Sequence, residues 1–185
     1  MSTRTMVVGA LLTALVIILQ FMGAAIRFGP FSISLVLIPI AIGAITCGKT
    51  IGAWLGLVFG VVVLASGDAA PFWAVNTAGT IVTVLVKGMA AGFISALVYE
   101  IILKLTKKAY PPAIVAALVC PIVNTGVFLL GCLVFFMKTV TEWAGGSNVG
   151  TYMIVVLVGF NFLFEMAVNI IFAPAISHVV KVVKK

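Results

Sequence analysis

The segment GAITCGKT, residues 43–50, matches the phosphate-loop pattern G-x-x-x-x-G-K-[ST] at every fixed position. In nucleotide-binding proteins this loop leaves a buried strand and opens a helix, so that backbone N–H groups and the Lys surround phosphates. Here both flanks are apolar enough for membrane spans, which makes Gly48 and Lys49 the turn of a helical hairpin. A Walker-type site also needs an acidic Mg²⁺ ligand, yet the only aspartate, Asp68, is predicted on the opposite side of the membrane. The match is therefore predicted to be coincidental, with Lys49 setting topology.

Other residues that commonly catalyse reactions are sparse. The single histidine, His178, is expected near the cytoplasmic end of the last span. The four acidic residues form no predicted neighbouring pair for acid–base or metal chemistry. Three cysteines without metal-ligand spacing are expected to be packing residues: Cys47, Cys120 and Cys132. The sequence therefore predicts a protein that is not an enzyme and indicates no cofactor or metal.

Two ionisable side chains, Lys87 and Glu165, fall inside apolar segments. A charge in mid-membrane costs at least about 2.5–3.5 kcal/mol on insertion scales, so it usually faces a cavity, a partner or a substrate. Asn161 and Asn169 share a helix face with Glu165, and Asn124 lies in the preceding span. One interpretation is a structural Lys87–Glu165 ion pair. The other is an outward-facing polar cavity, in which Lys87 binds a carboxylate or phosphate and Glu165 orients Lys87 or accepts hydrogen bonds from substrate.

Two outer loops add aromatic, amide and glycine residues to this candidate site. They are GDAAPFWAVN at residues 67–76 and TEWAGGSNVGTY at residues 141–152, with RFGPFS at residues 27–32 expected to complete the mouth. Aromatic residues here can be simple interface anchors, or they can form a lid with glycine hinges. The candidate substrate-binding residues are Phe72, Trp73, Asn76, Lys87, Asn124, Trp143, Asn148, Tyr152, Asn161 and Glu165.

The elements that must position these residues are transmembrane helices. The chain has 185 residues, of which 64% are hydrophobic and 8% charged, against about 25% charged in soluble domains. Crossing about 30 Å of hydrocarbon takes about 20 apolar residues in a helix. The prediction is an all-α integral membrane protein, a single six-helix domain over residues 1–185, with spans at residues 6–25, 33–47, 51–66, 78–103, 111–136 and 152–179.

The net charge is +7, and most of the positive residues are predicted on one side of the membrane. This distribution argues against a nucleic-acid partner. Arg27 and Lys138 flank one face of the predicted bundle. The other face carries Arg4, Lys49, Lys104, Lys107, Lys108, Lys181, Lys184 and Lys185. The positive-inside rule therefore places both termini in the cytoplasm.

Small residues recur at every fourth position in three spans, which gives grooves where another helix backbone can approach. For the glycine series the expected role is internal packing, whereas the alanine pair has no role assigned from packing alone. The positions are Gly52, Gly56 and Gly60, then Gly88 and Gly92, and finally Ala10 and Ala14.

In the order and spacing of these features the chain resembles the substrate-binding S component of an energy-coupling factor (ECF) transporter. The resemblance covers nearly the whole chain and rests on Ala10-xxx-Ala14, the hairpin FSISLVLIPIAIGAITCGKTIGAWLGLVFG, the segment VNTGVFLLG and the segment GFNFLFEMAVNIIFAPAI. It implies high-affinity binding of a water-soluble vitamin or related micronutrient in a cavity made by the outer loops and the last three helices. It also implies a bacterial or archaeal-type cell membrane.

The resemblance further implies three partners, namely a shared transmembrane coupling protein and two cytosolic ATPases that hydrolyse ATP. The S component would topple in the membrane on the coupling protein, and Ala10 and Ala14 match the surface that contacts it. Lys87 favours an anionic substrate such as pantothenate. The alternatives are a stand-alone secondary carrier or pore for a small polar solute, or a membrane scaffold without transport. The absence of an obvious internal repeat or of paired broken helices argues against the carrier.

Overall fold

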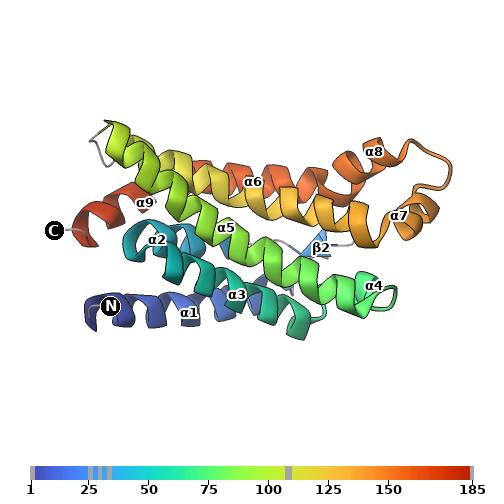
Figure 1. Cartoon of the computed structure of the whole chain (residues 1–185), viewed down its shortest axis with the longest axis horizontal. Coiled ribbons are helices and arrows are strands. Elements are labelled where there is room, and N and C mark those ends of the chain that lie inside the picture. Colours follow the sequence, from blue (N-terminus) through green and yellow to red (C-terminus); the bar gives the residue numbers. More distant parts are fainter. Residues whose placement is uncertain (1–2, 25–26, 29–30, 33–34, 107–109, 184–185) are drawn as a thin grey trace.

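The computed structural model describes residues 3–24, 27–28, 31–32, 35–106 and 110–183. These residues are almost wholly helical, which confirms the predicted all-α class (Figure 1). One two-residue antiparallel ladder joins β1 (Arg27–Phe28) to β2 (Phe31–Ser32). The helices are α1 (Thr3–Ala24), α2 (Leu37–Cys47), α3 (Lys49–Ser66), α4 (Ala70–Trp73), α5 (Thr77–Thr106), α6 (Tyr110–Phe135), α7 (Met137–Ala144), α8 (Val149–Thr151), the π-helix η1 (Tyr152–Gly159) and α9 (Phe160–Val183).

Within the described residues, five helices are long and apolar enough to cross a membrane. They are Thr3–Ala24, Lys49–Ser66, Thr77–Thr106, Pro111–Phe135 and Val149–Ile176. The second predicted span, residues 33–47, corresponds to α2, while residues 33–34 lie outside the described part. With 11 residues, α2 is about 16 Å long, about half of the hydrocarbon thickness. Six full-length spans are therefore not confirmed.

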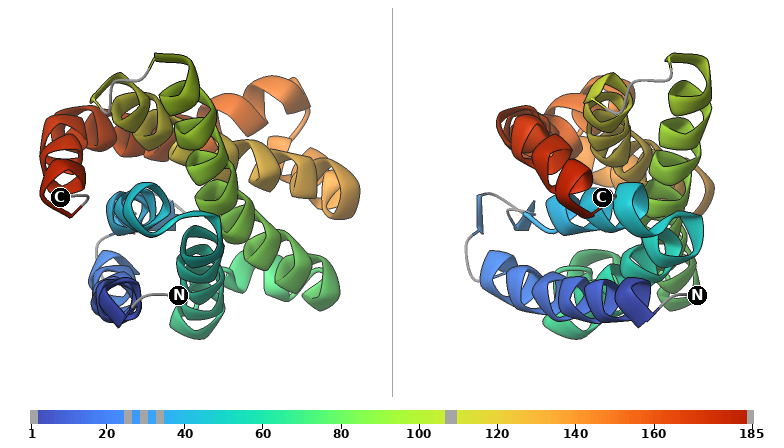
Figure 2. Two further views of the ribbon diagram at one scale, coloured as in Figure 1. Left: turned by 60° about the vertical axis from the view of Figure 1, so that its left-hand side comes forward. Right: turned by 90° about the vertical axis from the view of Figure 1, so that its left-hand side faces the viewer.

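The short helix α2 lies at the centre of the bundle and contacts α1, α3, α5, α6 and α9. Figure 2 shows it enclosed by these longer helices. Leu37, Ile40 and Ala41 on α2 are fully buried, as is Tyr99 on α5. The first turn of α1 and the last turn of α9 lie at the same end of the bundle, and α4, α7 and α8 lie at the other (Figure 1).

The glycines of α3 and α5 bring these two backbones into direct contact. Their spacing predicted close packing against another helix, without naming that helix. A Cβ atom added at Gly52 would lie 2.6 Å from the carbonyl oxygen of Gly92. A Cβ atom added at Gly56 would overlap the carbonyl group of Gly88. Glycine is required at these positions because any side chain would enter the neighbouring backbone.

The GAITCGKT segment forms the end of α2, a one-residue turn and the start of α3. Gly48 makes the turn with a φ of 88°, a left-handed conformation that glycine adopts without the strain of a Cβ atom. Residues 37–47 before the turn are helical, so no strand immediately precedes it in the described chain. Lys49 Nζ lies 3.0 Å from Glu100 Oε2, near the last turns of α5.

Candidate functional site

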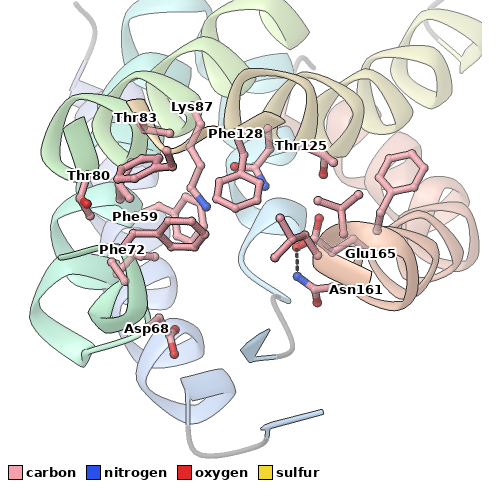
Figure 3. Close-up of a pocket in the computed structure, with 18 of the residues that line it drawn as sticks. Phe59, Asp68, Phe72, Thr80, Thr83, Lys87, Thr125, Phe128, Asn161 and Glu165 are labelled. Atoms are coloured by element: carbon pink, nitrogen blue, oxygen red, sulfur yellow. Dashed lines mark hydrogen bonds between the residues drawn. The ribbon is translucent and has the colours of Figure 1, made fainter. Parts of the chain in front are cut away.

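A cavity of about 90 Å³ lies between α1, α3, α5, α6 and the η1–α9 segment (Figure 3). Its wall is mixed, because aromatic and aliphatic side chains alternate with charged, amide and hydroxyl groups. The polar lining consists of Gln20 on α1, Asp68 after α3, Thr80, Thr83 and Lys87 on α5, Asn124 and Thr125 on α6, and Asn161 and Glu165 on α9.

Lys87 extends from α5 toward two aromatic rings in this cavity (Figure 3). Its Nζ atom lies 5.4 Å from the ring centre of Phe59 and 5.6 Å from that of Phe128. Both distances are within the range of cation–π attraction. In the described part of the chain, no carboxylate lies within 4.0 Å of this ammonium group. The aromatic rings therefore hold the cation while leaving its hydrogen-bond donors without an anionic partner there.

Glu165 lies on the α9 side of the same cavity and is 2% exposed. Its Oε1 atom accepts a hydrogen bond of 3.5 Å from Asn161 Nδ2. The Asn169 amide instead donates to the Glu165 backbone oxygen at 2.8 Å. Lys87 and Glu165 thus line one cavity without forming the direct ion pair that the structural interpretation required among these residues.

Gln20 and Asp68 connect α1 to the segment that follows α3. Gln20 Nε2 donates a hydrogen bond of 2.6 Å to Asp68 Oδ2, and both residues line the cavity. Sequence reasoning did not select either residue as a substrate contact. The sequence signal for Gln20 was an amide near the end of an otherwise apolar span. Whether such a residue faces a cavity depends on the rotation of its helix, which the sequence does not reveal.

Phe72 anchors an aromatic cluster at one side of the cavity. Its ring centre lies 5.6 Å from Phe128, 4.9 Å from Phe136 and 5.4 Å from Trp143, in edge-to-face geometries. Aromatic pairs favour such arrangements. Phe72 is 4% exposed and lines the cavity, whereas Trp143 reaches it only through Phe72. The cluster therefore ties α4, α6 and α7 together beside the polar groups.

The family model described as "ECF transporter, substrate-specific component" matches residues 4–177. This range includes nearly all described helical residues and every residue that lines the cavity. The chain belongs to this family. No curated protein and no solved structure matches it significantly.

Membership in the ECF family makes this chain a substrate-specific, multi-pass membrane subunit and not an enzyme. Its substrate is a small molecule, and its partners are the coupling and ATPase components of the transporter. The cavity combines a cation, carboxylates, amides and aromatic rings, which is the mixed lining typical of a small-molecule site.

Four other residues predicted to bind substrate in this S component do not line the cavity. Asn76 Oδ1 accepts from the Gly79 backbone N–H at 2.9 Å near the start of α5. Asn148 caps α8, where its Oδ1 accepts from the Thr151 backbone N–H at 3.0 Å. Of the other two, Trp73 is the last residue of α4 and Tyr152 is the first residue of η1. Contact of these four residues with substrate stays a prediction.

One face of α1 is open to the surroundings of the bundle. Ala10 and Ala14 are both exposed, and Leu11 between them is 67% exposed. Trp54 on α3 donates its indole N–H to Thr13 Oγ1 at 3.2 Å. This exposed surface is available to lipid or to a partner helix, so its contact with the coupling protein stays a prediction.

Proposed function

We propose that this S component binds a water-soluble vitamin or related micronutrient with an anionic group, such as pantothenate, and does so with high affinity. The observation that carries the proposal is the placement of Lys87 in the cavity. Its ammonium group is held over Phe59 and Phe128, with no carboxylate in ion-pair distance in the described chain. A carboxylate or phosphate of the substrate would supply a charge-assisted hydrogen bond that aromatic rings cannot supply.

Binding of such a substrate requires the site to open further. The cavity volume of about 90 Å³ is smaller than the roughly 300–1,000 Å³ of typical ligand pockets. Beside the polar groups, Phe72 on the short helix α4 contacts Phe128 on the long helix α6 and Trp143 on the short helix α7. Movement of α4 and α7 would enlarge the cavity, so these segments act as the lid.

The transport cycle follows from the family's division of labour. The proposed orientation has both termini in the cytoplasm, α2 as a short sixth membrane element, and Ala10 and Ala14 in contact with the coupling protein. Toppling on that protein, powered by two cytosolic ATPases, would deliver the substrate. The phosphate-loop match is then coincidental, which is supported by the helices on both sides of Gly48 and by the Lys49–Glu100 pair.

The anionic substrate is tested by isothermal titration with pantothenate and with pantothenol, its neutral alcohol analogue. The wild-type protein should bind pantothenate at least about tenfold more tightly, since hydrogen bonds to charged groups contribute about 1.5–3 kcal/mol. Lys87→Met should abolish this preference. The control Lys49→Met removes a lysine that is paired with Glu100, and should retain it. An unchanged preference in Lys87→Met would contradict the assignment.

A further inference from the structure

Four buried polar atoms of the described residues lack a hydrogen-bond partner. They are Gln20 Oε1, Thr83 Oγ1, Asn124 Oδ1 and Asn169 Oδ1. Buried polar groups are nearly always paired, so each unpaired one calls for a physical reason. Three of these four atoms belong to residues that line the cavity, where a bound molecule can supply a partner.

The surroundings of each atom separate the four into different roles. The Thr83 side chain, including its hydroxyl, packs against Gly131 of α6, and the hydroxyl stays without a hydrogen-bond partner there. Asn169 does not line the cavity. The Gln20 amide nitrogen donates a hydrogen bond to Asp68, and an ionised carboxylate can only accept. The unpaired atom of the Gln20 amide is therefore its oxygen. Gln20 Oε1 on α1 and Asn124 Oδ1 on α6 are thus the two unpaired amide oxygens of residues that line the cavity.

The cavity lining contains hydrogen-bond acceptors as well as donors. Lys87 supplies an ammonium donor, whereas Gln20, Asn124 and Glu165 supply oxygen acceptors. A simple anion would satisfy Lys87 and leave the two amide oxygens unpaired. Building on the anionic substrate of the proposed function, we propose that the substrate also donates hydrogen bonds from hydroxyl or amide N–H groups to Gln20 and Asn124. The substrate class is thus a hydroxy acid or amido acid.

Two anions of equal carbon framework test this inference by titration. Pantoate carries two hydroxyl groups, and 3,3-dimethylbutyrate has the same carboxylate and branched frame without them. The wild-type protein should bind pantoate at least about tenfold more tightly, because a site built to bond a polar group rejects the analogue that lacks it. Equal affinities would overturn the inference. If neither anion binds, the titration with pantothenate described above decides the anionic substrate, and the melting temperatures described below decide the role of the Asn124 oxygen.

Asn124→Leu removes one free oxygen, and Asn169→Leu is its matched control outside the cavity. The Asn124 variant should lose about five- to tenfold in pantoate affinity, while the Asn169 variant should retain it within about twofold. Without ligand, Asn124→Leu should melt at or above the wild-type temperature, because an unpaired buried group is removed. A clearly lower melting temperature without ligand would show that Asn124 is satisfied within the protein and would overturn the inference. Asn124→Ala provides a second variant for the same two readouts.

Discussion

The contact between the α3 and α5 backbones predicts a specific response to Gly56→Ala. A Cβ atom at position 56 would overlap the carbonyl group of Gly88, which cannot rotate away as a side chain can. At the neighbouring Gly52, the added atom would lie 2.6 Å from an oxygen, against a practical minimum of 3.0 Å. The α3 and α5 backbones would therefore have to move apart by at least 0.4 Å at Gly52. They would have to move further at Gly56, where the overlap is larger.

The cost of this separation can be bounded. Overpacking a well-packed site costs about 1–3 kcal/mol, and replacing a helical glycine by alanine returns about 0.5–1 kcal/mol. Gly56→Ala should therefore destabilise the protein by up to about 2.5 kcal/mol. For chains of 150–250 residues this corresponds to a melting temperature lower by up to about 10 °C. Moving α3 away from α5 also separates Phe59 from Lys87, now 5.4 Å apart, so pantothenate affinity should fall.

Thermal unfolding of the purified protein in mild detergent measures the first effect, and titration measures the second. Gly126→Ala is the matched control, because a Cβ atom there meets nothing within 4 Å. This control should melt at or above the wild-type temperature. If Gly56→Ala melts as high as Gly126→Ala, the two backbones are not in the contact described and the reasoning is refuted.

Three further predictions concern the aromatic cluster, the ion pair and the exposed face of α1. Phe72→Ala should lower stability by about 3–5 kcal/mol in thermal unfolding, and Phe72→Leu by much less; equal effects would contradict the role of packing volume. Glu100→Gln breaks a pair whose side chains are 39% and 38% exposed, so the same assay should show a loss below about 1 kcal/mol, and a larger loss would argue against solvent screening of Lys49. Ala10→Leu with Ala14→Leu should reduce co-purification of the coupling protein at unchanged pantothenate affinity, whereas unchanged co-purification would exclude this face as the contact.

Much of the scaffold could be predicted because membrane helices follow directly from apolar length. The first predicted span, residues 6–25, differs from α1 (Thr3–Ala24) by only a few residues at its start. The glycine spacing predicted close helix packing, because small residues one turn apart are what close backbone approach requires, but it did not identify α3 and α5 as the two partners. The length of α2 was not predictable in this way, because a helix enclosed by other helices is as apolar as one that spans lipid.

The candidate site was partly predictable for a similar reason. Lys87 and Glu165 stand out as charges in apolar segments, and the structure places both in one cavity. Phe59 and Gln20 were missed because an aromatic ring or a single amide in a span is common, and only the rotation of α3 and α1 brings them to the site. Asn148 was instead selected as a binding residue, although its side chain caps α8. In the sequence alone, a capping asparagine cannot be told apart from one that binds substrate.

Connections that lack a strong pattern gave the largest differences in secondary structure. The predicted outer loop at residues 137–151 contains α7 and α8, and the loop at residues 67–77 contains α4. Short helices of this kind depend on packing rather than on propensity, as the contact of Trp143 with Phe72 shows. The π-helix at the start of the last predicted span is likewise invisible in a uniformly apolar sequence.

Mass spectrometry of small molecules released by denaturation tests the central claim most directly. The protein would be purified in mild detergent from cells grown in rich medium, with Lys87→Met purified in parallel. We expect about one equivalent of a vitamin-like molecule with an anionic group from the wild-type protein, and much less from the variant, because Lys87 is the cation in the described cavity lining. Release of a neutral molecule in equal amounts from both proteins would contradict the account.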